Sequence, residues 1–107
     1  MLLEICANSY QSAENAQISG ANRVELCIDL SNDGITPSDS LLKKVAKKIT
    51  IPVFVLIRPR SGNFIYSEIE FEIMKQNIIH CKNLGYNGIV SGVLNQDNSI
   101  DINRTKE

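Results

Sequence analysis

The stretch IPVFVLIRPRSGNFIYS, residues 51–67, contains the signals that decide the fold. Its first part, residues 51–57, is apolar and β-branched, which is typical of a parallel strand covered on both faces. The run stops at Arg58 and Arg60, and a helix is predicted to begin at Ser67, where Glu70 completes a capping box. This order of strand, loop and helix predicts one unit of an α/β protein. It also places two guanidinium groups where the strand ends.

The same order repeats on both sides of this stretch. β-rich runs at residues 2–6, 23–27 and 88–94 alternate with helical patterns at residues 9–19 and from residue 36 onward. Strands separated by helices are expected to be parallel, with right-handed crossovers. The pattern fits either a doubly wound open sheet or part of a (β/α)8 barrel.

The end of the sequence favours the second architecture. The tail SIDINRTKE, residues 99–107, follows the fourth strand and begins a further helix, as in half of a larger repeat. We therefore predict a single α/β domain over residues 1–107, a partial TIM (β/α)8 barrel of about four parallel strands with three to four helices. Asn8 with Gln11, and Thr36 before Pro37, are predicted to open the first two helices.

Composition narrows the range of partners. The 107 residues carry a formal charge of −1, which gives no general attraction to nucleic acid or to an anionic membrane. No apolar run reaches the roughly 18 residues of a membrane span, and the start MLLEICANS lacks the basic region of a signal peptide. The 3 cysteines are an odd and dispersed set, unlike a secreted disulfide scaffold. We expect a cytoplasmic protein.

Arg58 and Arg60 are candidates for ligand binding. In parallel α/β folds, ligands bind at the carboxyl ends of the strands, and here the arginines are followed by a polar loop and a helix start at Ser67. This arrangement predicts an anion-binding corner. The alternative is that Arg58 pairs with a buried carboxylate and Arg60 is solvated.

Period-two alternation supplies the carboxylates. Glu4 shares a strand face with Cys6, and Glu25 shares one with Cys27. If these faces point into a barrel with Arg58, the charges converge, and the arginines are expected to neutralise the two glutamates. The alternation also admits the reverse, with both glutamates facing outward under the helices.

Cys6 and Cys27 are expected at matching points of neighbouring strands, which lie about 4.8 Å apart in a parallel sheet. Two inward sulfur atoms at that spacing can share one small ion, and soft thiolates select Cu(I). The alternative is that both are small buried apolar residues, as free cysteines often are. Cys81 is expected in the core.

The chain resembles the CutC family of copper homeostasis proteins. The resemblance is carried by LEICANSYQSAENAQISGANRVELC (3–27), LSNDGITPS (30–38), IPVFVLIRPRSGNFIYSEIEFEIMKQNI (51–78) and GYNGIVSGVLNQDNSID (85–101). It implies a (β/α)8 barrel of roughly twice this length, of which this chain is the N-terminal half. It also implies copper ligation by Cys6 and Cys27.

Four positions depart from the family pattern. Ser61 and Asp33 stand where glycine is usual, Asn63 where aspartate is usual, and Ser91 where an aromatic residue is common. Replacing glycine restricts a loop that needs positive φ. Asn63 removes a negative charge from the surroundings of the two arginines.

These observations leave three functional hypotheses. The first is a copper homeostasis protein that binds Cu(I) through Cys6 and Cys27. The second is an uncharacterised barrel enzyme or small-anion binder, which would use the four charged candidates Glu4, Glu25, Arg58 and Arg60. The third is an inactive truncated fragment. No glycine-rich phosphate motif, nucleophile elbow or zinc-protease pattern assigns a reaction. The expected partners are a metal ion or small anion and a second copy bound through open sheet edges.

Overall fold

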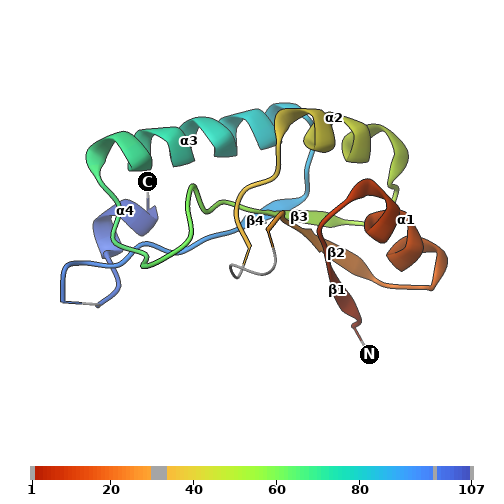
Figure 1. Cartoon of the computed structure of the whole chain (residues 1–107), viewed down its shortest axis with the longest axis horizontal. Coiled ribbons are helices and arrows are strands. Elements are labelled where there is room, and N and C mark those ends of the chain that lie inside the picture. The colour runs from red at the N-terminus through yellow and green to blue at the C-terminus, as the bar shows by residue number, and fades with distance from the viewer. Residues whose placement is uncertain (1, 30–33, 98, 107) are drawn as a thin grey trace.

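Four parallel strands form one sheet in chain order (Figure 1). The computed structural model describes residues 2–29, 34–97 and 99–106. Within them the strands are β1 (Glu4–Ala7), β2 (Arg23–Leu26), β3 (Val53–Leu56) and β4 (Gly88–Val90). Each strand pairs with the next one along the chain, and all pairs are parallel.

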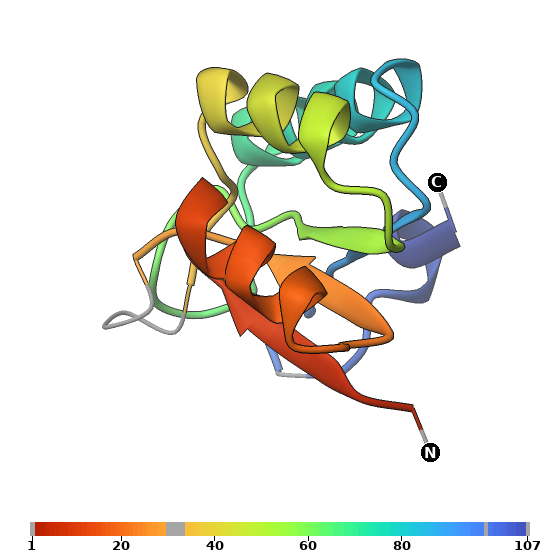
Figure 2. The same cartoon turned by 90° about the vertical axis from the view of Figure 1, so that its right-hand side faces the viewer.

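A helix follows each strand. They are α1 (Tyr10–Ile18), α2 (Asp39–Lys48), α3 (Glu68–Asn83) and the short α4 (Ile102–Lys106). Figures 1 and 2 show α1, α2 and α3 on the same side of the curved sheet. A doubly wound sheet reverses its strand order at a switch point and carries helices on both faces. The unreversed order with helices on one side is that of a partial (β/α)8 barrel, as predicted.

The core lies between the sheet and these helices. Alternate strand residues face it and are buried, including Ala7, Val24, Leu26, Val53 and Val55. Removing this apolar surface from water is the main favourable contribution to folding. The core therefore fixes which strand faces remain for a site, because the other alternate residues must point to the opposite side.

The opposite face, which would line the inside of a complete barrel, is open. On β1 and β2 it carries polar side chains, and on β3 and β4 it carries mainly apolar ones; the set is Glu4, Cys6, Arg23, Glu25, Phe54, Leu56, Gly88 and Val90. Phe54 and Leu56 are only partly buried. The prediction that residues 51–57 form a strand covered on both faces is therefore wrong. Helices cover one face of β3, and no described element packs fully across the other.

The helix caps correct one prediction and confirm another. Ser9, not Asn8, caps α1, and its partner in the capping box is Ser12. Ser9 has the extended backbone that a cap residue needs, and its hydroxyl accepts the N–H of Ser12. The box of Ser67 and Glu70 at the start of α3 is present as predicted.

Thr36 does not cap α2. Ser38 takes that position, and its hydroxyl accepts the N–H of Leu41. The Thr36 hydroxyl is used elsewhere, since it accepts the backbone N–H of Arg58 at 2.7 Å. Thr36, which the sequence predicts as a helix cap, thus joins the segment before α2 to the end of β3.

The outer strands of the sheet are β1 and β4. Unpaired strand edges can bind another chain, and association of two copies through these edges stays a prediction. No helix in the described ranges has both the length and the apolar character that crossing a membrane requires.

Candidate functional site

Cys6 lies on the open face of β1 and is exposed. The strand register places it beside Glu25 of β2. The Cys6 Sγ atom lies 3.9 Å from Glu25 Oε2, within reach of a weak S–H hydrogen bond. A thiol and a carboxylate thus meet on adjacent strands, as the alternation predicted.

Cys27 follows β2 directly, on the same face as Glu25, and only 2% of its surface is exposed. Because Cys6 pairs with Glu25, Cys27 stands two residues further along. The prediction that the two cysteines occupy matching points is therefore wrong. The offset separates their Cα atoms by about 8 Å, so the side chains must lean toward each other to share an ion.

A short hairpin base covers Cys27; we use this name for residues 28–29 and 34–35. Ile28 and Ile35 exchange two backbone hydrogen bonds, at 3.0 and 2.8 Å. Gly34 rests directly on the thiol, since a Cβ atom built there would lie 3.4 Å from Cys27 Sγ and 3.1 Å from Leu56 Cδ2. The departure noted at Asp33 lies outside the described residues.

Both thiols are shifted toward the protonated form. Burial raises the pKa of the Cys6 thiol, and the charges of Glu25 and Glu4 raise it further. The pKa of Cys27 is also raised, first by burial, then by interaction with Cys6 and with Glu25. A metal that binds the two thiols must therefore displace protons.

Glu4 finds a different partner from the predicted one. Its carboxylate forms an ion pair with Arg23 of β2 at 2.9 Å, so the expected neutralisation of Glu4 by Arg58 or Arg60 is wrong. The guanidinium of Arg23 also lies over the ring of Phe54, 4.9 Å from its centroid. Period-two alternation places Arg23 on the face of Glu25, and this signal could have identified it from the sequence.

Arg60 is partly exposed and is not directed at the glutamates of the strands. It pairs with Glu70 of α3 at 2.6 Å and donates to the carbonyl oxygens of Asn63 and Ile65, both at 2.7 Å. Arg60 lowers the pKa of the Glu70 carboxyl. The left-handed conformation of this loop falls on Gly62, with φ +100°, and Ser61 needs no positive φ.

Arg58 is buried, with 5% of its surface exposed. Its Nη1 donates to the carbonyl oxygen of Gly34 at 3.0 Å, and its Nη2 donates to that of Gly62 at 2.7 Å. The guanidinium lies over the ring of Phe64, 5.0 Å from the centroid. Arg58 therefore binds the backbone of two loops at once.

A pocket of about 590 Å³ opens beside Arg58 at the ends of β3 and β4. Its walls are mostly apolar and include Leu56, Phe64 and Leu94. Ser91 also lines it, and its hydroxyl donates to the carbonyl oxygen of Ile57 at 2.9 Å. Anion binding by the arginines stays a prediction.

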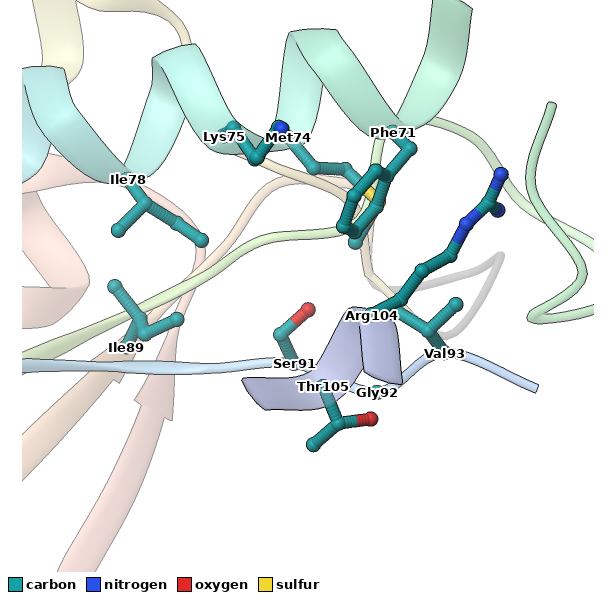
Figure 3. Close-up of a pocket in the computed structure, with 10 residues that line it drawn as sticks. All are labelled: Phe71, Met74, Lys75, Ile78, Ile89, Ser91, Gly92, Val93, Arg104 and Thr105. Carbon is teal, nitrogen blue, oxygen red and sulfur yellow. The ribbon is translucent and has the colours of Figure 1, made fainter. Parts of the chain in front are cut away.

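A second pocket, of about 310 Å³, lies between α3, β4 and α4 (Figure 3). Phe71 and Ile89 form part of its apolar lining, and Arg104 lies 4.7 Å from the centroid of the Phe71 ring. Arg104 donates to the carbonyl oxygen of Tyr66 at 2.7 Å and pairs with Glu68. This pocket is on the helix side of the sheet and is not shared with the cysteines.

Among the described residues, no three His, Cys, Asp or Glu side chains lie close enough together to hold a metal ion. Structural zinc sites use four ligands, whereas two soft thiols suit Cu(I). The open face therefore carries one exposed and one buried thiol at neighbouring strand ends, with the Glu25 carboxylate beside Cys6.

This chain is similar to known CutC proteins in sequence and to a solved CutC structure in fold. The human copper homeostasis protein cutC homolog is 49% identical over 100 residues, which cover 94% of this chain and 37% of that protein. A CutC family protein of Vibrio campbellii is 47% identical over 98 residues, 92% of this chain and 40% of its own length. A solved CutC structure from Streptococcus agalactiae superposes with a TM-score of 0.91 at 34% identity.

The extent of these matches agrees with a half-barrel. The chain spans about two fifths of the length of the curated relatives. The structural match covers 99% of this chain and 52% of the solved CutC chain. The family model for CutC matches residues 1–107. This chain therefore belongs to the CutC family.

Proposed function

We propose that this chain provides the Cu(I)-binding site of a copper homeostasis protein, with Cys6 and Cys27 as the two ligands. The observation that carries the proposal is that both thiols lie on the same face at the carboxyl ends of neighbouring strands. The human relative is named for copper homeostasis, which supports copper as the cargo.

The chemistry of the two thiols fits this ion. Thiolates are soft ligands and prefer Cu(I) to harder cations. Because the pKa of each thiol is raised, binding at neutral pH releases protons, and the affinity for Cu(I) is expected to increase as the pH rises. Cys6, which is exposed, is the ligand that a copper donor would reach first.

The test is a titration of the reduced chain with Cu(I) under anaerobic conditions, in competition with a chromophoric Cu(I) chelator. We expect about one equivalent bound per chain, because the site uses one pair of thiols. The Cys6→Ser, Cys27→Ser double variant should lose this binding. Cys81→Ser is the matched control and should retain it, since Cys81 lies in the core. Equal copper uptake by the double variant and the wild type would overturn the proposal.

The anion-binding alternative has less support. The guanidinium of Arg58 donates to the carbonyl oxygens of Gly34 and Gly62, and that of Arg60 donates to carbonyl oxygens of its own loop and to Glu70. An arginine that holds backbone in this way contributes to structure first. For this reason we place copper binding ahead of it and assign no reaction.

A further inference from the structure

We infer that Arg58 is a positioning residue that fastens the hairpin base over Cys27 and thereby controls access to this thiol. Arg58 would control access to the Cys27 thiol whether or not copper binds there. Only the effect of this control on metal binding rests on the proposed function. The guanidinium stands at the end of β3 because it attaches a neighbouring loop to that strand.

In the described part of the chain, three hydrogen bonds join Arg58 at the end of β3 to the segment before α2, and one of them comes from its side chain. The Arg58 guanidinium donates to the Gly34 carbonyl oxygen at 3.0 Å in a buried position. The Arg58 backbone N–H donates to the Thr36 hydroxyl at 2.7 Å, and the Thr36 N–H donates to the Arg58 carbonyl oxygen at 2.9 Å. Buried bonds of this kind cost free energy when one partner is removed, because the other is left unsatisfied.

The second arm of the guanidinium fixes its direction. Nη2 donates to the Gly62 carbonyl oxygen at 2.7 Å, while the group lies over the Phe64 ring. This use of two separate donors depends on the planar fork of arginine, which a lysine ammonium cannot reproduce. Arg58 therefore holds the hairpin base and the loop after β3 in one fixed relation.

Gly34 shows that the cover is in close contact with the thiol. Its φ of +88° favours glycine, and a methyl group there would press on Leu56 and Cys27. Backbone at this distance excludes water and reagents from the sulfur atom. The low exposure of Cys27 thus depends on the position of Gly34, whose carbonyl oxygen Arg58 binds.

The hairpin base has bonds of its own that do not involve Arg58. Ile28 and Ile35 are paired, and Gly34 donates to the Asp29 carbonyl oxygen at 3.0 Å. Loss of the Arg58 side chain removes the bond to Gly34 but leaves the two backbone bonds to Thr36, so the hairpin base should loosen over Cys27 without unfolding. Local opening of this kind exposes a buried group at a rate set by the free energy of the opening.

The test is pulsed alkylation of the reduced, copper-free chain with iodoacetamide, with each cysteine quantified by peptide mass spectrometry. In Arg58→Ala the labelling rate of Cys27 should rise by about tenfold or more. In Arg58→Lys it should rise less. Cys6 should change little, because it is exposed already. Arg60→Ala is the matched control and should leave the Cys27 rate near that of the wild type, since its bonds run to its own loop and to α3.

Cys81 reports on global stability, because it is buried in the core with 1% of its surface exposed. A rise at Cys81 in step with Cys27 would overturn the inference, since Arg58 would then only stabilise the whole fold. An unchanged Cys27 rate would also overturn it. If Arg58→Ala does not fold, Thr36→Val removes one bond of the attachment and should raise Cys27 labelling by roughly threefold. No measurement here uses copper, so a failure of the proposed function would leave the result intact.

Discussion

The carboxyl ends of β1 and β2 offer the same chemical group in opposite surroundings. Cys6 at the first is exposed, whereas Cys27 at the second is buried. The connection that follows each strand makes the difference. After β1, residues 8–9 lead directly into α1, so this connection is too short to fold back over the strand. After β2, residues 27–38 precede α2, and the described part of this connection returns to cover the thiol.

This contrast teaches that connection length can leave one strand-end thiol open and cover the next one. For the proposed copper site, the open thiol would let a donor approach and the covered thiol would slow the loss of a bound ion. In a barrel the connections at the carboxyl ends of the strands form the active face. The sheet alone would have left both thiols equally accessible.

The largest effect is expected from crowding the covered thiol. Gly34→Ala should destabilise the fold by about 3 kcal/mol, because the left-handed conformation costs about 1–2 kcal/mol and overpacking against Leu56 and Cys27 adds about 1–3 kcal/mol. Gly85→Ala is the matched control, since Gly85 has the same φ of +88° with nothing within 4 Å. Its loss should be nearer 1 kcal/mol. Urea unfolding followed by circular dichroism measures both, and equal losses would mean that the cover is not packed on the thiol.

The fold could be predicted because its signals are local. Alternating strand and helix patterns, and caps such as Ser67 with Glu70, are properties of neighbouring residues. The register between β1 and β2 is not local, and an error of two residues put Cys6 opposite Cys27 instead of Glu25. Period-two alternation fixes the face of a side chain but not its position along the neighbouring strand.

The partners of the charged residues escaped prediction for a related reason. Glu4 of β1 pairs with Arg23 of the neighbouring strand β2, and Arg60 pairs with Glu70, ten residues further along the chain. Both partners were visible in the sequence, but opposite charges can pair in many combinations until the elements are placed. Arg58 was least predictable, because its described acceptors are backbone carbonyl oxygens, which every residue has.

A smaller effect is expected at the open thiol. Glu25→Gln should lower the pKa of the Cys6 thiol, because the neutral amide no longer disfavours the thiolate. The pKa should stay above its ordinary value, since burial is the larger cause. The pKa of Cys27 should fall too, but less, because Glu25 ranks behind burial and Cys6 there. The pH dependence of alkylation of each cysteine measures this.

Glu14→Gln controls for this second prediction. Glu14 lies on α1 and is not among the groups that shift the pKa of either cysteine at the strand ends. An unchanged or higher pKa of Cys6 in Glu25→Gln would show that the carboxylate and the thiol do not interact on the open face.

The smallest effect is expected in the loop that contains Arg60 and Asn63, and it tests whether this loop is independent of the cover over Cys27. Asn63→Asp restores the residue usual in the family and places a carboxylate near Arg60 Nη2, which lies 3.4 Å from Asn63 Oδ1. The added attraction is partly exposed to solvent and should increase stability by less than about 1 kcal/mol, with the gain lost at high salt. The Ile65 N–H can keep its bond to the side chain of residue 63, so the turn is preserved. Urea unfolding at low and high salt measures the gain. The labelling rate of Cys27 should not change, because the described link from this loop to the hairpin base runs through Arg58 and its partners Gly62 and Gly34, which the substitution leaves in place. A changed rate would mean that this loop and the cover move together and that the division between Arg58 and Arg60 is wrong.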